Sequence, residues 1–208
     1  MGTDIHFKLE TYEDGMWKDQ PFQIVWEGRK PKFADRPIAP SVFANRNYNL
    51  FAILADVRNG HGFAGIRTGE GWPSIAANRG VPKDYQGEIP GDHSLTWMTL
   101  QELKEFGWDE VETYLYGVIP AADYETLTPG FPPKNYAGDV GGYDVKVYTP
   151  GEYAFAKRQQ ILAPHSYVRV SWRMTARAAT YNWVGEVVPW LETVAAGRPL
   201  RLIIGFDS

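Results

Sequence analysis

Apolar and polar residues alternate at both ends of the chain. Near the N-terminus every second residue of 4–10 is apolar, the dipeptide Asp14-Gly15 follows, and a second apolar run occupies 21–26. A period of two is typical of a strand with one buried face, and Asp-Gly is a common hairpin turn. The sequence therefore predicts an N-terminal β-hairpin, and the apolar run at 200–207 predicts a closing strand.

The clearest helical pattern lies in the first third of the chain. Apolar residues recur at helical spacing over residues 50–57. Asn47 or Asn49 can cap the start of this helix, and Gly60 can end it. We therefore predict a buried helix that begins close to Asn47 or Asn49 and ends at Gly60.

Two further helices are marked by local signals. Thr99 and Glu102 have the spacing of a capping box, which predicts a helix start. A long helix is predicted from about Thr175 to Ala196, with a bend at Pro189. The remaining predicted elements are short helices at 120–127 and 151–162 and strands at 111–119, 143–148 and 166–174.

Three stretches rich in glycine and proline separate these elements, at 27–42, 63–90 and 128–142. A loop as long as 63–90 is usually functional in a compact protein, so we treat it as a candidate lid. Strands at both ends with helices between them predict a single α+β domain spanning 1–208. Its sheet is expected to be largely antiparallel, to include the N- and C-terminal strands, and to pack against helices.

Composition and charge narrow the classes of function. The 208 residues carry a net charge of −4, which gives no general basic field for a long nucleic acid. The chain has no cysteine, so a metal site would have to use His, Asp or Glu. No apolar run approaches the roughly 20 residues that cross a bilayer. We therefore expect a cytoplasmic protein without a membrane partner.

Polar residues of the terminal strands form the first candidate site. If these strands share one sheet with the strand at 166–174, the face opposite the helices combines carboxylates, imidazole, guanidinium groups and a phenol. Arginine matches phosphate bidentately, and tyrosine can stack on a base. A solvated face of mixed charge is the alternative interpretation. The residues on this predicted face are Asp4, His6, Tyr167, Arg169, Arg173, Arg201 and Asp207.

Two other groups of polar residues flank predicted helices. Asp92 and His93 precede the second helix, and Arg46 precedes the first, where helix N-termini attract anions. The first helix is followed by ADVRNGHG, in which a structural role for Asn59 as part of a helix stop is favoured. The ligand-binding candidates around this helix are Arg46, Tyr48, Asp56, Arg58 and Asn59.

Four blocks of sequence resemble a family of uncharacterised proteins encoded by bacteriophages and prophages. The blocks are MGTDIH, RNYNLFAILADVRNGHGFAG, DHSLTWMTLQEL and the terminal GFDS. The resemblance covers about half the chain and brings no established activity. Its recurrent positions correspond to Asp4, His6, Arg46, Asn47, Tyr48, Asp56, Arg58, Asn59, Gly60, His93 and Asp207. A phage setting implies an accessory protein of the host cytoplasm that counters host defence.

Three hypotheses of function follow. The first is a binding module for a nucleotide-like anion, which could sequester an antiviral second messenger of the host. The second is a phosphodiesterase or nucleotide hydrolase in which Asp4, His6 and His93 act as acid and base or hold a divalent metal ion. The third is a protein-binding inhibitor that uses exposed aromatic residues. A homo-oligomer is compatible with each of the three.

Overall fold

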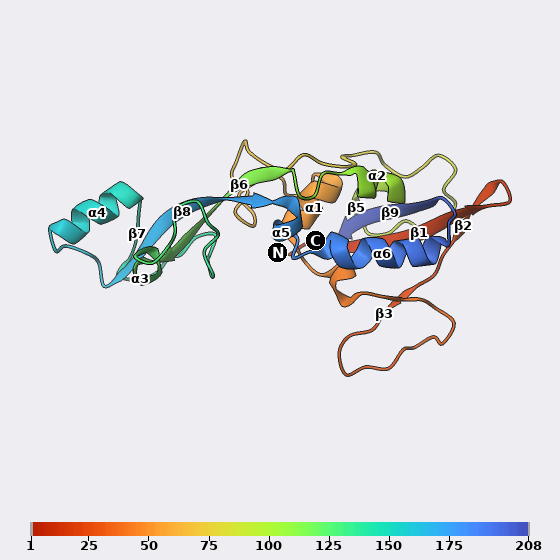
Figure 1. Cartoon of the computed structure of the whole chain (residues 1–208), viewed down its shortest axis with the longest axis horizontal. Coiled ribbons are helices and arrows are strands. Elements are labelled where there is room, and N and C mark those ends of the chain that lie inside the picture. Colours follow the sequence, from red (N-terminus) through yellow and green to blue (C-terminus); the bar gives the residue numbers. More distant parts are fainter. Residues whose placement is uncertain (1, 208) are drawn as a thin grey trace.

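The computed structural model describes residues 2–207 and has two parts (Figure 1). We call residues 112–175 the arm, because they extend to one side of the molecule. We call the remaining residues the body, which holds both chain ends. The two ends lie next to each other, near the base of the arm (Figure 1).

The body is built on a four-stranded antiparallel sheet in the order β2-β1-β9-β5. Its strands are β1 (Asp4–Glu13), β2 (Met16–Asp19), β5 (His93–Thr99) and β9 (Leu200–Asp207). The first residue of β1 faces the last residue of β9, because Asp4 is paired with Asp207. The closing strand, the hairpin turn at Asp14-Gly15 and the α+β class with both terminal strands in one sheet are confirmed. The predicted return strand at 21–26 is wrong, because β2 (Met16–Asp19) pairs with β1, and only Gln23–Ile24 of that run forms a strand, in parallel with a later segment.

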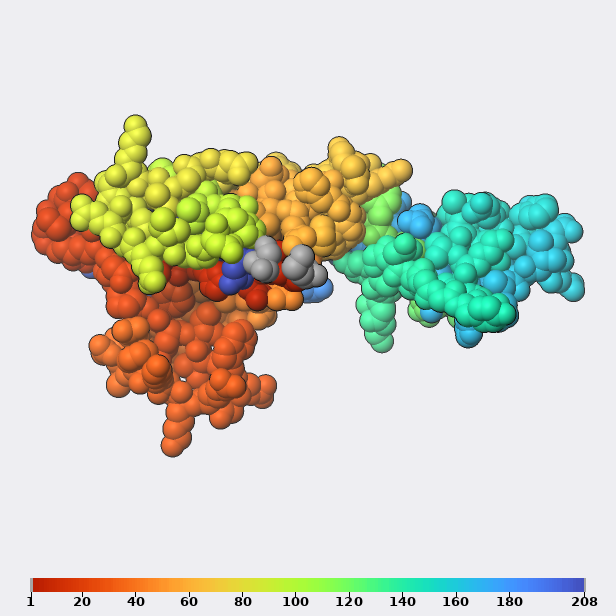
Figure 2. Space-filling view, turned by 180° about the vertical axis from the view of Figure 1, so that it is seen from behind, coloured from red at the N-terminus to blue at the C-terminus, as the bar shows by residue number. Residues whose placement is uncertain are grey.

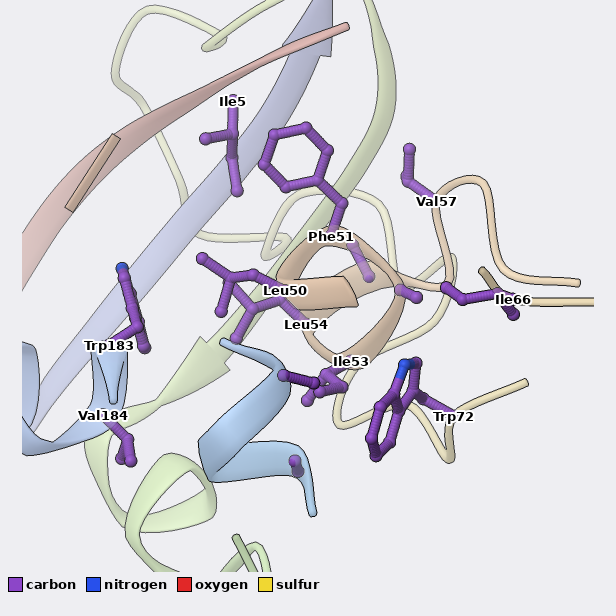
Figure 3. Packing of buried hydrophobic residues seen from close by; sticks show 14 of the residues in the cluster. Ile5, Leu50, Phe51, Ile53, Leu54, Val57, Ile66, Trp72, Trp183 and Val184 are labelled. Carbon is purple, nitrogen blue, oxygen red and sulfur yellow. The ribbon is translucent and has the colours of Figure 1, made fainter. Parts of the chain in front are cut away.

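Helices cover the apolar face of β1 in the body sheet. Helix α1 (Tyr48–Ala55) is apolar on all sides, and all of its residues after Tyr48 are buried, as expected for a helix inside a core. Figure 3 shows Phe51 directed toward Ile5 of β1. Phe43 of the 3₁₀ helix η1 (Ser41–Ala44) stacks on Phe7 with 4.2 Å between ring centroids.

The segment 63–90 crosses the opposite face of this sheet. It begins beside α1, where the backbone N–H groups of Ile75 and Ala76 donate to the carbonyls of Ile53 and Leu54. It ends on β9, where a Cβ on Gly205 would overlap the carbonyl oxygen of Pro90. The prediction of a lid is therefore wrong, because backbone hydrogen bonds fasten this loop to the body.

The arm contains a separate three-stranded sheet in the order β6-β8-β7. Strand β6 (Glu112–Pro120) pairs antiparallel with β8 (His165–Thr175), and β7 (Val145–Tyr148) pairs parallel with β8. Two short helices, α3 (Ala121–Tyr124) and α4 (Pro150–Arg158), complete the arm. The expectation that the strand at 166–174 shares a sheet with the terminal strands is wrong.

The helices differ from prediction mainly at their ends. Asn47 caps α1 as predicted, since its side chain accepts from the N–H of Leu50, but α1 ends at Asp56, in the left-handed conformation. The capping box of α2 (Leu100–Glu105) is confirmed. The single long helix predicted from Thr175 is wrong. It is divided into α5 (Ala176–Ala179) and α6 (Trp183–Ala195), because Tyr181 and Asn182 adopt positive φ angles.

A second loop leaves the body between β3 (Gln23–Ile24) and β4 (Ile38–Ala39). These two strands pair in parallel and close the base of the loop. In the space-filling view the loop projects away from the body (Figure 2). Within residues 2–207 no helix has the length and apolar character needed to cross a bilayer.

Candidate functional site

Five of the predicted residues meet at the end of the body sheet, and we call them the terminal cluster: Asp4, His6, Arg46, His93 and Asp207. Arg46 donates from Nε and Nη2 to Asp4 Oδ1, at 2.9 and 2.6 Å. His6 Nε2 lies 2.9 Å from Asp207 Oδ2. His93 pairs in register with Phe206 on the next strand, and its charge also acts on Asp207. Sequence analysis placed Asp4, His6 and Asp207 on one face, whereas it assigned Arg46 to the start of the first helix and His93 to a separate loop.

The terminal cluster is an exposed network of ion pairs. Its side chains are between 37% and 57% exposed. The hydrogen bond with His6 lowers the pKa of the Asp207 carboxyl, and the bond with Asp4 raises the pKa of Arg46. Across residues 2–207, no three His, Asp or Glu side chains are grouped so that they could hold a metal ion.

The pairing of His6 with Asp207 predicts a pH dependence. A carboxyl whose pKa is lower in the folded state stabilises the fold above its unfolded pKa, and the contribution is lost as the pH falls through the folded pKa. We expect His6→Ala to raise the pKa of Asp207 in an NMR titration. The melting temperature at neutral pH should stay within about 2 °C of wild type, as for most surface substitutions. An unchanged titration of Asp207 would contradict the pairing.

His6 also lines a small hollow of about 370 Å³ beneath the end of the segment 63–90. Lys8 and Glu88 face each other across this hollow, with 3.6 Å between Nζ and Oε2. The hollow therefore combines charges that neutralise each other, and it offers no surplus of positive charge to an anion.

The residues after α1 have structural roles. Asn59 donates from Nδ2 to Asp56 Oδ1 and to the carbonyl of Trp72, and its Oδ1 accepts from the N–H of Trp72. Arg58 donates to Thr3 Oγ1 and lies 4.2 Å from the ring centroid of Phe63. These side chains fasten the start of the segment 63–90 and the N-terminus to α1. The favoured structural interpretation of Asn59 agrees with this arrangement.

A substitution of Asn59 distinguishes a structural role of this residue from a role in ligand binding. Asn59→Ala leaves the buried backbone N–H and C=O of Trp72 without their partner, which should lower the free energy of unfolding by about 2–3 kcal/mol. Chemical denaturation measures this change. The control Asp56→Asn keeps an acceptor oxygen and tolerates the left-handed backbone, so it should have little effect. A stable Asn59→Ala protein that loses ligand binding would instead support a binding role.

Three residues of the predicted polar face lie elsewhere. Tyr167, Arg169 and Arg173 belong to β8 in the arm, and Arg173 pairs with Glu112 at 2.8 Å. Arg201 shares the face of Asp4, His6 and Asp207, as predicted, but it is only 3% exposed, because the segment 63–90 covers it. The predicted common face is therefore wrong for the three residues of the arm.

A second hollow lies in the arm, and we call it the arm pocket. Its volume is about 670 Å³, within the range of small-molecule sites. On this edge of β8, β7 pairs only with residues 165–168, and Gly130 forms an isolated bridge to Trp172. The pocket lies beside the stretch of β8 between these two contacts. The polar and aromatic residues that line it are Arg67, Tyr116, Tyr124, Glu125, Thr149 and Arg169.

The body contributes one of these residues to the arm pocket. Arg67 belongs to the segment 63–90 and lies 5.2 Å from the ring centroid of Tyr116. The N–H of Tyr116 donates to the carbonyl of Gly65 at 2.9 Å, which fixes this part of the segment on the outer edge of β6. A guanidinium group from the body and Arg169 of the arm therefore line the same pocket.

The acidic residue of the arm pocket is held by neighbours. Glu125 Oε1 accepts from the Tyr153 hydroxyl at 2.6 Å, and Oε2 accepts from Lys157 Nζ. The hydrogen bonds from Lys157 and Tyr153 lower the pKa of Glu125. The bond with Glu125, together with burial, raises the pKa of Tyr153 to about 12. Glu125 therefore stays ionised while Lys157 balances its charge.

Of the predicted ligand-binding residues, only Arg169 lines the arm pocket. Sequence analysis missed Arg67, Tyr116 and Tyr124. Arg67 lies in a loop without regular spacing, and the two tyrosines lie in elements predicted for their apolar pattern. The one local signal that could have indicated Arg67 is its position between two glycines in GIRTG, residues 65–69.

Comparison with protein-family models, with curated proteins and with solved structures gives no match to this chain.

Proposed function

We propose that this protein is a phage-encoded accessory protein that binds a nucleotide-like anionic small molecule in the arm pocket. Such binding would sequester a second messenger of host defence. The observation that carries the proposal is the convergence of Arg67 and Arg169 on a hollow of about 670 Å³ that is also lined by tyrosine rings.

Positive charge in the arm pocket favours an anion. Arg67 contacts the ring of Tyr116, and the carboxylate nearest to Arg169, that of Asp139, lies at 3.9 Å. Guanidinium groups without a close carboxylate can donate two hydrogen bonds to the oxygens of a phosphate group. Glu125 opposes the anion only weakly, because Lys157 and Tyr153 occupy its two oxygens.

Aromatic and apolar groups of the arm pocket favour a ligand with a planar ring. Tyr116 and Tyr124 line it together with the aliphatic surfaces of Leu127 and Val170. A phenol ring offers a stacking surface of low conformational entropy, and aromatic pairs gain about 0.5–1.5 kcal/mol beyond area burial. A nucleotide combines the two required features, a planar base and a phosphate group.

Native mass spectrometry of protein purified from infected cells tests this proposal. We expect a bound small molecule, and we expect its release to lower the melting temperature, since a ligand of the folded state stabilises it. Thermal-shift assays with mononucleotides and cyclic dinucleotides would then define its class. A ligand-free spectrum together with no thermal shift across that panel would refute the proposal.

The charge balance around Glu125 gives a second test. Lys157→Met removes the cation that faces Glu125 Oε2, so the carboxylate should repel an anion and weaken its binding by about 3- to 10-fold. Calorimetric titration with the ligand found above measures the change. The double variant Glu125→Gln/Lys157→Met should restore affinity. Lys104→Met, which breaks the ion pair with Glu192 on the body, is the matched control and should leave affinity unchanged.

A further inference from the structure

The loop between β3 and β4 carries a concentration of positive charge. We call residues 27–36 the basic loop. It holds four cations, Arg29, Lys30, Lys32 and Arg36, and two carboxylates. Its net charge is +2 in a chain whose total is −4, so the remaining residues carry −6. Figure 1 shows the loop hanging away from the body, and Figure 2 shows the same projection from behind.

The cations at the tip of the basic loop are exposed and have no carboxylate partner among residues 2–207. Arg29, Lys30 and Lys32 are all exposed to solvent. Elsewhere on the surface, cations such as Arg46 and Arg177 form ion pairs at 2.6 and 2.7 Å. The charge of the basic loop is therefore not balanced within the chain.

A buried glutamine holds the backbone of the basic loop in place. Gln23 Nε2 donates to the carbonyls of Phe33 and Arg36, the latter at 3.1 Å. Its Oε1 accepts from the N–H groups of Lys32 and Phe33, at 2.9 and 3.1 Å. An amide side chain can make four such bonds, and Gln23 makes all of them. The loop is therefore preorganised, although it contains no regular secondary structure.

Packing inside the basic loop adds to this order. The guanidinium carbon of Arg36 lies 3.9 Å from the ring centroid of Phe33. A turn is closed by the N–H of Arg29, which donates to the carbonyl of Trp26 at 3.0 Å. Arg36 is thus engaged inside the loop, while Arg29 and the two lysines remain available to a partner.

We propose that the basic loop docks onto an acidic surface of a partner protein. Preorganised cations lower the entropic cost of binding and steer an oppositely charged partner. Trp26 and Ile38, which are 45% and 48% exposed, add apolar surface at the base of the loop. A cationic tip beside an exposed tryptophan has the composition of a protein interface.

The charge of the rest of the chain argues against a nucleic acid as this partner. A nucleic-acid strand would extend past the loop and meet a body of net negative charge, within the roughly 10 Å over which charges act at 0.1 M salt. A protein surface can instead place its carboxylates at the loop alone. The proposal is independent of the arm pocket, because no residue of the basic loop lines that pocket.

A matched pair of charge reversals tests the proposal. The probes are a short Asp/Glu-rich peptide and an oligothymidylate of equal net charge. We expect Lys30→Glu/Lys32→Glu to weaken peptide binding at least about tenfold. The control Lys83→Glu/Lys134→Glu changes the net charge equally, at two other exposed lysines, and should change affinity less than about twofold. Equal losses in the two variants would show a general charge effect and overturn the proposal.

Two further experiments test the role of Gln23 and the class of partner. Gln23→Leu keeps every charge and removes the four hydrogen bonds, so it should weaken peptide binding about 3- to 5-fold if preorganisation matters. Unchanged binding by a folded Gln23→Leu protein would refute that part. Tighter binding of the oligothymidylate than of the peptide would overturn the assignment to a protein partner.

Discussion

Replacement of Arg201 by methionine is expected to lower the free energy of unfolding by about 3–5 kcal/mol. Arg201 is 3% exposed, and its Nε donates to Glu10 Oε2 at 2.7 Å. Its Nη1 donates to Asp84 at 2.8 Å, and the guanidinium carbon lies 4.2 Å from the ring centroid of Trp17. The substitution leaves the buried carboxylate of Glu10 without a cation, and burial of an uncompensated charge is costly.

Denaturation with urea measures this loss. Glu10→Leu/Arg201→Met removes both charges and should recover a large part of the stability, because two apolar residues can replace a buried pair at little cost. Arg198→Ala, at a partly exposed ion pair with Glu13, is the surface control and should cost less than about 1 kcal/mol. A loss of less than 1 kcal/mol for Arg201→Met would contradict the central role of this pair.

Removal of both guanidinium groups of the arm pocket is expected to weaken ligand binding by at least about 100-fold. Each charge-assisted hydrogen bond contributes about 1.5–3 kcal/mol, and two at the lower limit correspond to that factor. The variant is Arg67→Ala/Arg169→Ala, and the measurement is calorimetric titration with the ligand identified by mass spectrometry. Both side chains lie at the surface of the pocket, so the fold should persist.

A control on the same strand makes this result specific. Arg173 belongs to β8 and shares the sheet face of Arg169, but it pairs with Glu112 and does not line the arm pocket. Arg173→Ala should therefore leave affinity within about twofold of wild type. If the two-arginine variant also kept its affinity, the ligand would bind elsewhere and the terminal cluster would become the next candidate.

The two proposed sites can be distinguished by the same variants. Arg67→Ala/Arg169→Ala should not affect binding of the acidic peptide to the basic loop. Lys30→Glu/Lys32→Glu should not affect binding of the small molecule. The phage setting remains a proposal that rests on the sequence resemblance alone.

Local patterns were sufficient for the terminal strands, the turn at Asp14-Gly15 and the helix caps. Period-two alternation over residues 4–10 identifies β1, and Asn47 and the Thr99/Glu102 box mark the starts of α1 and α2. These features depend on backbone hydrogen bonds and burial within a few residues. The shared face of Asp4, His6 and Asp207 also followed from sequence, because β1 and β9 lie in one sheet and their polar positions coincide in register. Arg46 joins these residues only through the tertiary structure.

Longer-range features needed the tertiary structure. The alternation of β8 predicted its inner and outer faces, but the choice between two sheets depends on which strands it meets. Tyr181 and Asn182 divide the predicted long helix through left-handed backbone conformations that no spacing signal indicates. The segment 63–90 resembled a free loop because its hydrogen bonds are made to elements distant in sequence.

The sequence by itself determined the α+β class, the meeting of the two chain ends and the charged character of that end of the sheet. Only the tertiary structure decided that Arg201 is buried, because β9 is central and the segment 63–90 covers its second face. Only the tertiary structure brought Arg67 of the body and Arg169 of the arm into the lining of one pocket. Periodicity records which residues face a core, whereas a pocket depends on contacts between segments about a hundred residues apart, which leave no local pattern.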